Sequence, residues 1–128
     1  MSDPRDMSGV WYGHYASSSG SEHNGFIAVL EESGGVFSGS ISEPDGGGGV
    51  RRASVAGRRS GGLIQFVKQY RGRSDDAVLY EGGVDDQGLQ ASGNWTIDLA
   101  AAGGFSMARE KFSIEELEAE IEEGIAVR

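Results

Sequence analysis

The sequence contains no cysteine and only two prolines. The absence of cysteine excludes a disulfide framework and thiol catalysis, and nothing in the chain requires an oxidising compartment. No apolar run approaches the roughly 18 residues of a membrane-spanning helix. Residues 1–9 are polar and lack the apolar core of a secretory signal. We therefore expect a cytoplasmic protein with no membrane association.

Glycine is abundant, at 22 of 128 residues, while hydrophobic residues make up only 38%. Apart from the run at 46–49, the glycines are scattered singly or in pairs between apolar runs. Glycines spaced in this way are typical of turns, bulges and sharp bends in a β-protein. The length corresponds to one domain.

Strand-like runs separated by turn signals recur along the chain at 9–16, 25–32, 35–43, 50–58, 62–71, 76–84, 88–97 and 104–110. Their mostly short connections are of hairpin type and leave no room for parallel crossovers. The sequence predicts an all-β fold, an eight-stranded antiparallel up-and-down (meander) barrel over residues 9–110. Residues 1–8 are expected to be a disordered N-terminus.

The last segment, residues 111–128, predicts an acidic amphipathic helix and tail. Ser113 and Glu116 form a capping box, and apolar residues recur with helical spacing at Ile114, Leu117 and Ile121. This short C-terminal α-helix would pack on the barrel or on a partner.

Two-residue periodicity assigns the strand faces. The face richest in aromatics in each strand also carries glycines or a late polar residue, which suits the interior of a small barrel. The candidate ligand-binding residues on these inner faces are Trp11, Tyr15, Glu43, Phe66, Lys68, Tyr70, Tyr80, Trp95 and Arg109. Their polar members fall near strand ends and could line the barrel mouths.

The pattern Gly9-x-Trp11 on the first strand and Arg109 on the last resembles the calycin superfamily of lipocalins, fatty-acid-binding proteins and avidins. The resemblance implies that the arginine lies across the tryptophan at one end of the barrel, and that a small molecule binds inside. A second Gly-x-Trp, Gly93 to Trp95, and the absence of cysteines depart from lipocalins. The whole pattern is more similar to a small bacterial barrel family of uncharacterised function.

A buried Lys68 needs a partner, because an unpaired ammonium costs several kcal/mol to desolvate. Glu43 shares its face and could be that partner. One interpretation makes the inner polar cluster an anchor for an anionic or hydroxylated ligand, with Trp11, Phe66 and Trp95 as apolar walls. The members of this cluster are Glu43, Lys68, Tyr70, Tyr80 and Arg109. A second makes it a structural ion pair in a filled barrel. A third places Lys68 in water across a bulge.

No catalytic or metal-binding constellation is apparent. No Ser-His-Asp arrangement or nucleophile elbow is present, and Glu43 is the one placed candidate for a general base. His14, His23 and Glu22 approach a metal-ligand number, but a surface histidine is the simpler interpretation. The sequence favours a non-enzymatic protein with no cofactor and no metal.

Charge is unevenly distributed. Residues 51–73 hold seven cations and no acid, whereas residues 110–128 hold seven acids and two cations. The cations predict a basic ribbon on the fourth and fifth strands, but the pI near 4.6 argues against nucleic acid. The acidic helix could dock on this ribbon, within one subunit or across a homo-dimer.

Together these features predict a binding protein that holds a small, partly apolar ligand with a polar or anionic group inside its barrel. The alternative is a structural or protein-interaction module with a filled barrel, which self-associates through the basic ribbon and the acidic helix.

Overall fold

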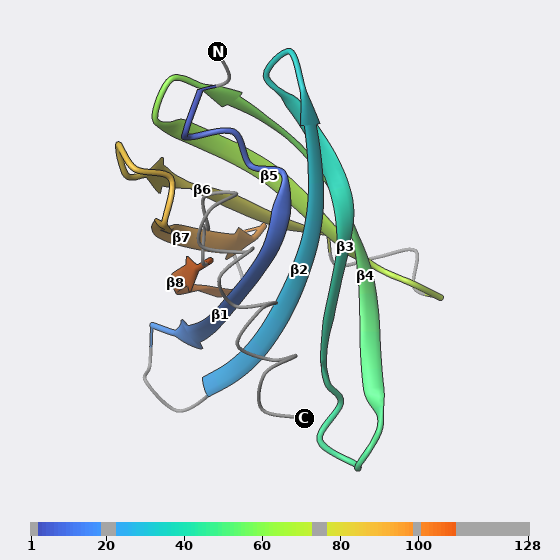
Figure 1. Cartoon of the computed structure of the whole chain (residues 1–128). Coiled ribbons are helices and arrows are strands. Elements are labelled where there is room, and N and C mark those ends of the chain that lie inside the picture. The colour runs from blue at the N-terminus through green and yellow to red at the C-terminus, as the bar shows by residue number, and fades with distance from the viewer. Residues whose placement is uncertain (1–2, 19–22, 73–76, 99–100, 110–128) are drawn as a thin grey trace, which may run out of the picture.

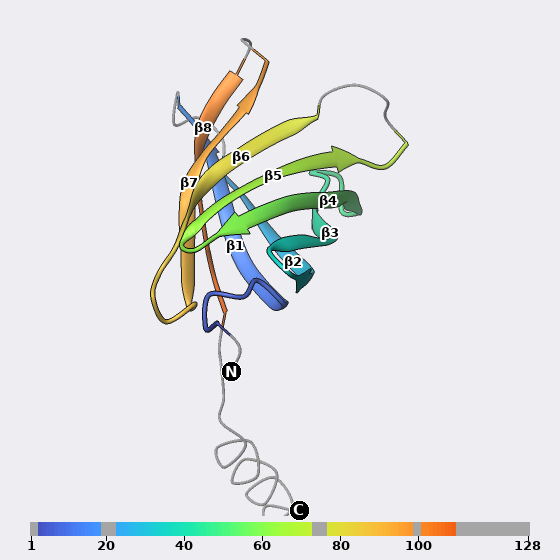
Figure 2. The same ribbon diagram turned by 90° about the horizontal axis from the view of Figure 1, so that it is seen from above.

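Eight antiparallel strands close into a barrel in the computed structural model, which describes residues 3–18, 23–72, 77–98 and 101–109. Each strand pairs with its neighbours in the chain, and β1 also pairs with β8 (Figures 1 and 2). The strands are β1 (Gly9–Ser17), β2 (His23–Ser33), β3 (Val36–Pro44), β4 (Val50–Ser60), β5 (Leu63–Tyr70), β6 (Val78–Val84), β7 (Gln90–Ile97) and β8 (Ala101–Ala108). The predicted all-β, up-and-down barrel is confirmed. The predicted C-terminal helix lies outside the described residues.

Alternation of side chains divides each strand between the interior and the outer surface. In β4, Ala53 and Val55 are buried while Ser54 and Ala56 are exposed. The same two-residue period runs through β5, where Ile64 and the residues two and four positions later are buried. Apolar inward positions alternate with outward ones because successive side chains of a strand point to opposite faces.

Inward glycines make room for the large rings, as the sequence pattern predicts. A Cβ atom on Gly57 would overlap the backbone and side chain of Phe66 on the paired strand β5. A Cβ atom on Gly103 would come within 2.7 Å of the indole nitrogen of Trp95. A small barrel can hold these rings only where the neighbouring position lacks a side chain.

The two ends of the barrel differ. At one end, which we call the closed end, strands are joined by two-residue turns at Gly34–Gly35 and Gly61–Gly62 and by a longer connection through residues 85–89. Gly34, Gly35 and Gly61 have positive φ, which suits tight hairpins. At the other, the loop end, strands are joined through residues 18–22, 45–49, 71–77 and 98–100.

Residues 3–8 lie at the closed end, beside the turns that join β2 to β3 and β4 to β5 (Figure 1). Met7 is fully buried in the hydrophobic core, and its carbonyl accepts a hydrogen bond of 2.9 Å from the Trp11 indole. We expected residues 1–8 to be disordered from their polar composition, and the structure differs for residues 3–8. A buried methionine and a backbone acceptor for a buried indole anchor this segment.

The middle of the barrel is occupied by aromatic rings. Phe66 stacks on Tyr80 with ring centroids 4.6 Å apart, and Phe105 meets both rings edge to face at 6.0 and 5.1 Å. Phe37 packs edge to face against Phe66 at 5.8 Å. Such offset and edge-to-face pairs add to the stabilisation by burial. Within the described part of the chain, no helix is long and apolar enough to span a membrane.

Candidate functional site

The inner polar residues at the loop end meet in one cluster around Glu43. Lys68 of β5 is 1% exposed, and its Nζ donates to Glu43 Oε2 of β3 at 3.4 Å. The interpretation that places Lys68 in water is therefore wrong. β4 lies between these two strands, so the side chains of Lys68 and Glu43 meet over the inner face of β4 at the loop end.

One oxygen of Glu43 accepts most of the hydrogen bonds in the cluster. Its Oε1 accepts from the Tyr70 hydroxyl at 2.7 Å and from the Tyr15 hydroxyl at 3.0 Å. The Arg51 guanidinium donates to the same oxygen from Nε at 3.0 Å and from Nη2 at 2.7 Å. The short bonds of Arg51 make it the closer cationic partner of Glu43, and leave Lys68 with the long contact to Oε2.

Three tyrosine rings surround the Lys68 ammonium. Its Nζ lies 4.5 Å from the ring centroid of Tyr15, 4.7 Å from that of Tyr70 and 5.4 Å from that of Tyr80. These distances fall within the range of cation–π attraction, which is electrostatic and grows with desolvation. Side chains from five strands, β1 and β3 to β6, thus converge on one point at the loop end.

Burial and charge shift the proton affinities of the cluster. Burial alone would raise the pKa of Glu43, but the charge of Lys68 and the hydrogen bonds from Tyr70, Arg51 and Tyr15 outweigh it and hold the pKa below its usual value. Burial lowers the pKa of Lys68, against the attraction of Glu43. Glu43 is therefore ionised at neutral pH. The protonated form of Lys68 is less favoured than in a lysine exposed to water.

Arg51 was missed as a site residue because the sequence analysis assigned it to an outward basic ribbon. It shares its parity with the buried Ala53 and Val55, and this alternation could have placed it inside. Arg59 shares that parity too, and both arginines turn inward, at opposite ends of β4. Among the described arginines of the predicted ribbon, those that stay exposed are Arg52, Arg58 and Arg71, so the ribbon is narrower than expected.

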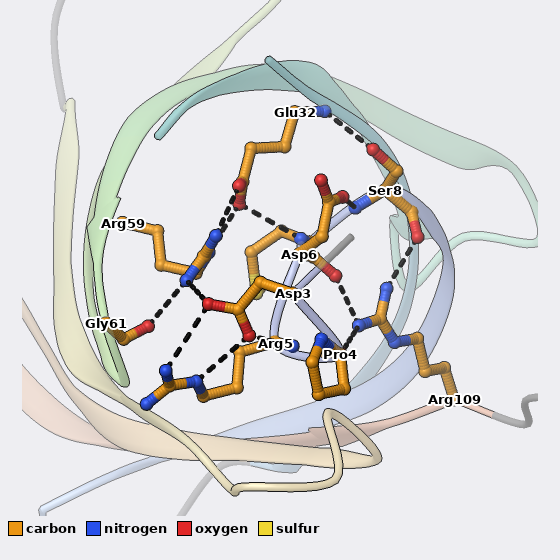
Figure 3. Close-up of polar contacts among 10 residues, drawn as sticks. Asp3, Pro4, Arg5, Asp6, Ser8, Glu32, Arg59, Gly61 and Arg109 are labelled. Carbon is orange, nitrogen blue, oxygen red and sulfur yellow. Dashed lines mark hydrogen bonds and ion pairs between the residues drawn. The ribbon is translucent and has the colours of Figure 1, made fainter. Parts of the chain in front are cut away.

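Arg109 lies at the closed end, where its guanidinium carbon is 4.3 Å from the ring centroid of Trp11. This is the contact implied by the resemblance to the calycins. The same guanidinium donates to the carbonyl of Gly88 at 2.7 Å. It also donates to the carbonyl of Ser8 at 2.5 Å and to those of Pro4 and Asp6 (Figure 3). Arg109 therefore binds the N-terminal segment to the barrel.

A second arginine completes the closed end. Arg59 donates to both carboxylate oxygens of Glu32 at 2.8 and 2.7 Å and to Asp3 at 3.1 Å (Figure 3). Glu32 also accepts the backbone N–H of Met7 at 3.0 Å. Hydrogen bonds from Arg5 and the contact with Arg59 lower the pKa of Asp3 to about 2. This network holds residues 3–8 across the end of the barrel.

The nine predicted site residues therefore do not form one site. Trp11 and Arg109 belong to the closed end, which corrects the prediction that Arg109 joins the Lys68 cluster. Phe66 lies in the middle, stacked on Tyr80. Trp95 packs edge to face on Tyr15 at 6.1 Å and donates to the carbonyl of Ala16 at 3.1 Å. The loop end thus brings together Tyr15, Glu43, Lys68, Tyr70, Tyr80 and Trp95.

Of the three residues weighed as metal ligands, only His14 has a side chain that the structure describes. His14 is exposed on β1, while Glu22 and the His23 side chain lie outside the described residues. Elsewhere in the described ranges, no three His, Cys, Asp or Glu side chains gather as metal ligands. Every buried side-chain nitrogen and oxygen in the described part of the chain has a hydrogen-bond partner.

Comparison with known proteins identifies similar folds only. No family model and no curated protein matches the sequence. A redesigned β-barrel matches with a TM-score of 0.73 and 10% identity over 85% of this chain and 96% of that one. A de novo designed fluorescence-activating β-barrel matches with a TM-score of 0.64 and 13% identity over 86% of this chain and 100% of that one. The likeness shows the fold alone.

Proposed function

We propose that this chain is a non-enzymatic binding protein that takes a small, partly apolar ligand with an anionic group at the loop end of its barrel. The observation that carries the proposal is the charge of the cluster, in which Arg51 and Lys68 share the single carboxylate of Glu43. The nearby Asp45 is exposed and accepts hydrogen bonds from the backbone of Gly47 and Gly49. Among the described residues, Glu43 is thus the one carboxylate in contact with both cations, and the charge of Asp45 also acts on Arg51.

The side chains of the loop end suit distinct parts of such a ligand. The Arg51 side chain is 38% exposed and can meet an anionic group arriving from solvent. Tyr15 and Tyr70 are partly buried and offer hydroxyl groups, and the Trp95 ring behind Tyr15 offers an apolar wall. This is the usual composition of small-molecule sites, mainly apolar with a few convergent polar groups.

Two further observations support this proposal. The strand order and the stacking of Arg109 on Trp11 are in keeping with a calycin-like barrel, a superfamily that binds small molecules. One of the similar structures is a designed barrel described as fluorescence-activating, which is also in keeping with a binding role. The aromatic rings that occupy the middle of the barrel favour a ligand at the loop end over one at its centre.

An anionic, partly apolar fluorescent probe tests the proposal. We expect 8-anilinonaphthalene-1-sulfonate to bind the folded protein with increased emission, and Arg51→Gln to weaken this binding about tenfold, the effect of about 1.4 kcal/mol from one charge-assisted contact. Arg52→Gln is the matched control, because Arg52 is the next residue on β4 and faces solvent. Equal binding by both variants would place the probe elsewhere and contradict the proposal.

A filled barrel that acts as an interaction module is the second candidate, favoured by the ring packing around Phe66 and by the satisfied polar groups of the described interior. On this proposal the acidic segment 111–128 mediates self-association. Sedimentation velocity of the full chain and of a chain lacking residues 112–128 tests it. Unchanged sedimentation would count against this segment as an interface, and loss of a dimer would support it.

A further inference from the structure

Lys68 is unusual among lysines because its side chain is almost completely buried. The chain has two lysines, Lys68 and Lys111, and the second lies outside the described residues. Lys68 is buried among three tyrosine rings, and its one described carboxylate contact, to Glu43, is 3.4 Å long. A primary amine held in such surroundings is a potential nucleophile once it loses its proton.

The charges of the cluster favour that loss. Arg51 makes two short hydrogen bonds to Glu43, so the carboxylate is already paired. Lys68, at 3.4 Å, is a second cation on the same carboxylate, so among the described residues two cations contact one carboxylate. A guanidinium does not release its proton in proteins. Lys68 is therefore the cation of this cluster that can become neutral.

We propose that Lys68 forms a reversible imine with the carbonyl group of a ligand, and that the ligand class is an aldehyde or ketone carrying a carboxylate that pairs with Arg51. This inference rests on the proposed binding function and specifies the reaction by which the protein would hold its ligand. The loop end offers the three groups such a ligand requires, namely the Lys68 amine, the partly exposed cation of Arg51 and the tyrosine rings beside them.

The step balances without any further reactant. The neutral amine of Lys68 attacks the carbonyl carbon, a C–N bond forms, and the carbonyl oxygen becomes the hydroxyl of a carbinolamine. Loss of that hydroxyl as water, with one proton from the nitrogen, gives the imine. Glu43 contacts Lys68 Nζ and can carry the proton from nitrogen to the leaving hydroxyl, while Tyr15 and Tyr70 hydrogen-bond the same carboxylate.

The surroundings of Lys68 also support a reactive amine. Burial and, to a smaller degree, the charge of Arg51 lower the pKa of Lys68, and Glu43 opposes them. The titratable groups that face the amine are Tyr15 of β1, Glu43 of β3, Arg51 of β4, Tyr70 of β5 and Tyr80 of β6. Burial raises the pKa of Tyr15, Tyr70 and Tyr80, so these phenols are neutral at physiological pH and do not add negative charge.

Reductive trapping in the full chain tests the inference. The protein is incubated at pH 7 with 4-formylbenzoate and sodium cyanoborohydride, and the labelled positions are mapped by mass spectrometry of its peptides. Lys111 serves as the reference amine within the same molecule. We expect Lys68 to be labelled about tenfold faster or more than Lys111, because Arg51 holds the carboxylate and positions the aldehyde.

Three variants and one neutral probe make the result specific. Arg51→Gln should slow the labelling of Lys68, whereas Arg52→Gln should leave it unchanged, and the neutral probe 4-formylbenzamide should react more slowly than the carboxylate. Lys68→Arg keeps the cation, cannot form an imine and should remove this label alone. Labelling of Lys68 no faster than that of Lys111 would overturn the inference.

A probe without a carbonyl separates this inference from the proposed function. Displacement of 8-anilinonaphthalene-1-sulfonate by p-toluate, together with absence of the Lys68 label, would retain the binding site and reject the imine. Failure of the fluorescent probe to bind in an Arg51-dependent manner would reject the binding function itself. Imine formation at Lys68 with probe binding that depends on Arg51 would support both.

Discussion

Replacement of Glu43 by glutamine should destabilise the barrel strongly, because within the described ranges this carboxylate contacts both Lys68 and Arg51. Removal of one partner from a buried ion pair costs about 3–5 kcal/mol. The Arg51 side chain is 38% exposed, so water can solvate it in part, and Lys68 can release its proton. We therefore expect a loss near the lower limit, about 3 kcal/mol at pH 7.

The pH dependence of this loss follows from Lys68. In the Glu43→Gln variant the pKa of Lys68 falls further, so the folded state binds fewer protons there than the unfolded state, whose lysine has a pKa near 10.5. Stability of the variant then rises with pH in the window below that value. We expect the difference between wild type and variant to narrow from pH 6 to pH 9, below the range in which tyrosines ionise.

A double-mutant cycle isolates the interaction. Lys68→Met should cost less than Glu43→Gln, because Arg51 still pairs with Glu43, and the double variant should be more stable than the two separate losses predict by about 1–3 kcal/mol. Urea unfolding followed by tryptophan fluorescence measures each free energy. Glu81→Gln, an exposed carboxylate on β6, is the control and should change stability by less than about 0.5 kcal/mol. Additive losses, or a Glu43→Gln variant as stable as the control, would refute the reasoning.

Three further outcomes are expected. Arg109→Gln should lower stability by about 2–4 kcal/mol in thermal unfolding, because buried carbonyls lose their donor, whereas the exposed Arg58→Gln should not. Gly57→Ala should cost about 1–3 kcal/mol in urea unfolding because its Cβ overlaps a phenylalanine, while Gly104→Ala, with only a 3.7 Å contact, should be tolerated. The lowered pKa of Glu43 means that its stabilisation is complete above the usual value of 4.5 and is lost as pH falls through the folded value. Because the pKa values of Asp3 and Asp45 are also lowered, a urea series from pH 6 to pH 2 should show a loss of stability in both proteins, and a larger loss in wild type than in Glu43→Gln.

The barrel and the inner faces of its strands could be predicted because side-chain alternation is a local property. Lys68 and Glu43 were placed on the inner face by counting residues within one strand, and the structure buries both. The end of the barrel at which each residue lies depends on strand direction as well. Odd and even strands of a meander run in opposite directions. The late residues of β3 and β5 therefore share the loop end, and Arg109, which follows β8, lies at the closed end.

The N-terminal segment could not be predicted in the same way. Its composition is polar, and Met7 alone gives a weak apolar signal. The contacts that hold it come from residues distant in sequence, since Arg109 donates to the carbonyls of Pro4 and Ser8 across more than 100 residues. Backbone carbonyls are present in every segment, so no residue type reveals which of them a buried guanidinium will use.

The two ends of β4 differ in what their inward arginines contact. Arg59 turns inward at the closed end, where Arg5, Arg59 and Arg109 lie among the described carboxylates of Asp3, Asp6, Glu32 and Asp85. Arg51 turns inward at the loop end, where it and Lys68 share Glu43. The network at the closed end binds the chain's own N-terminal segment. At the loop end the partly exposed Arg51 is the group that would meet the proposed anionic ligand. An arginine at each end of one strand therefore holds the N-terminal segment at one end and, under the proposed function, contacts the ligand at the other.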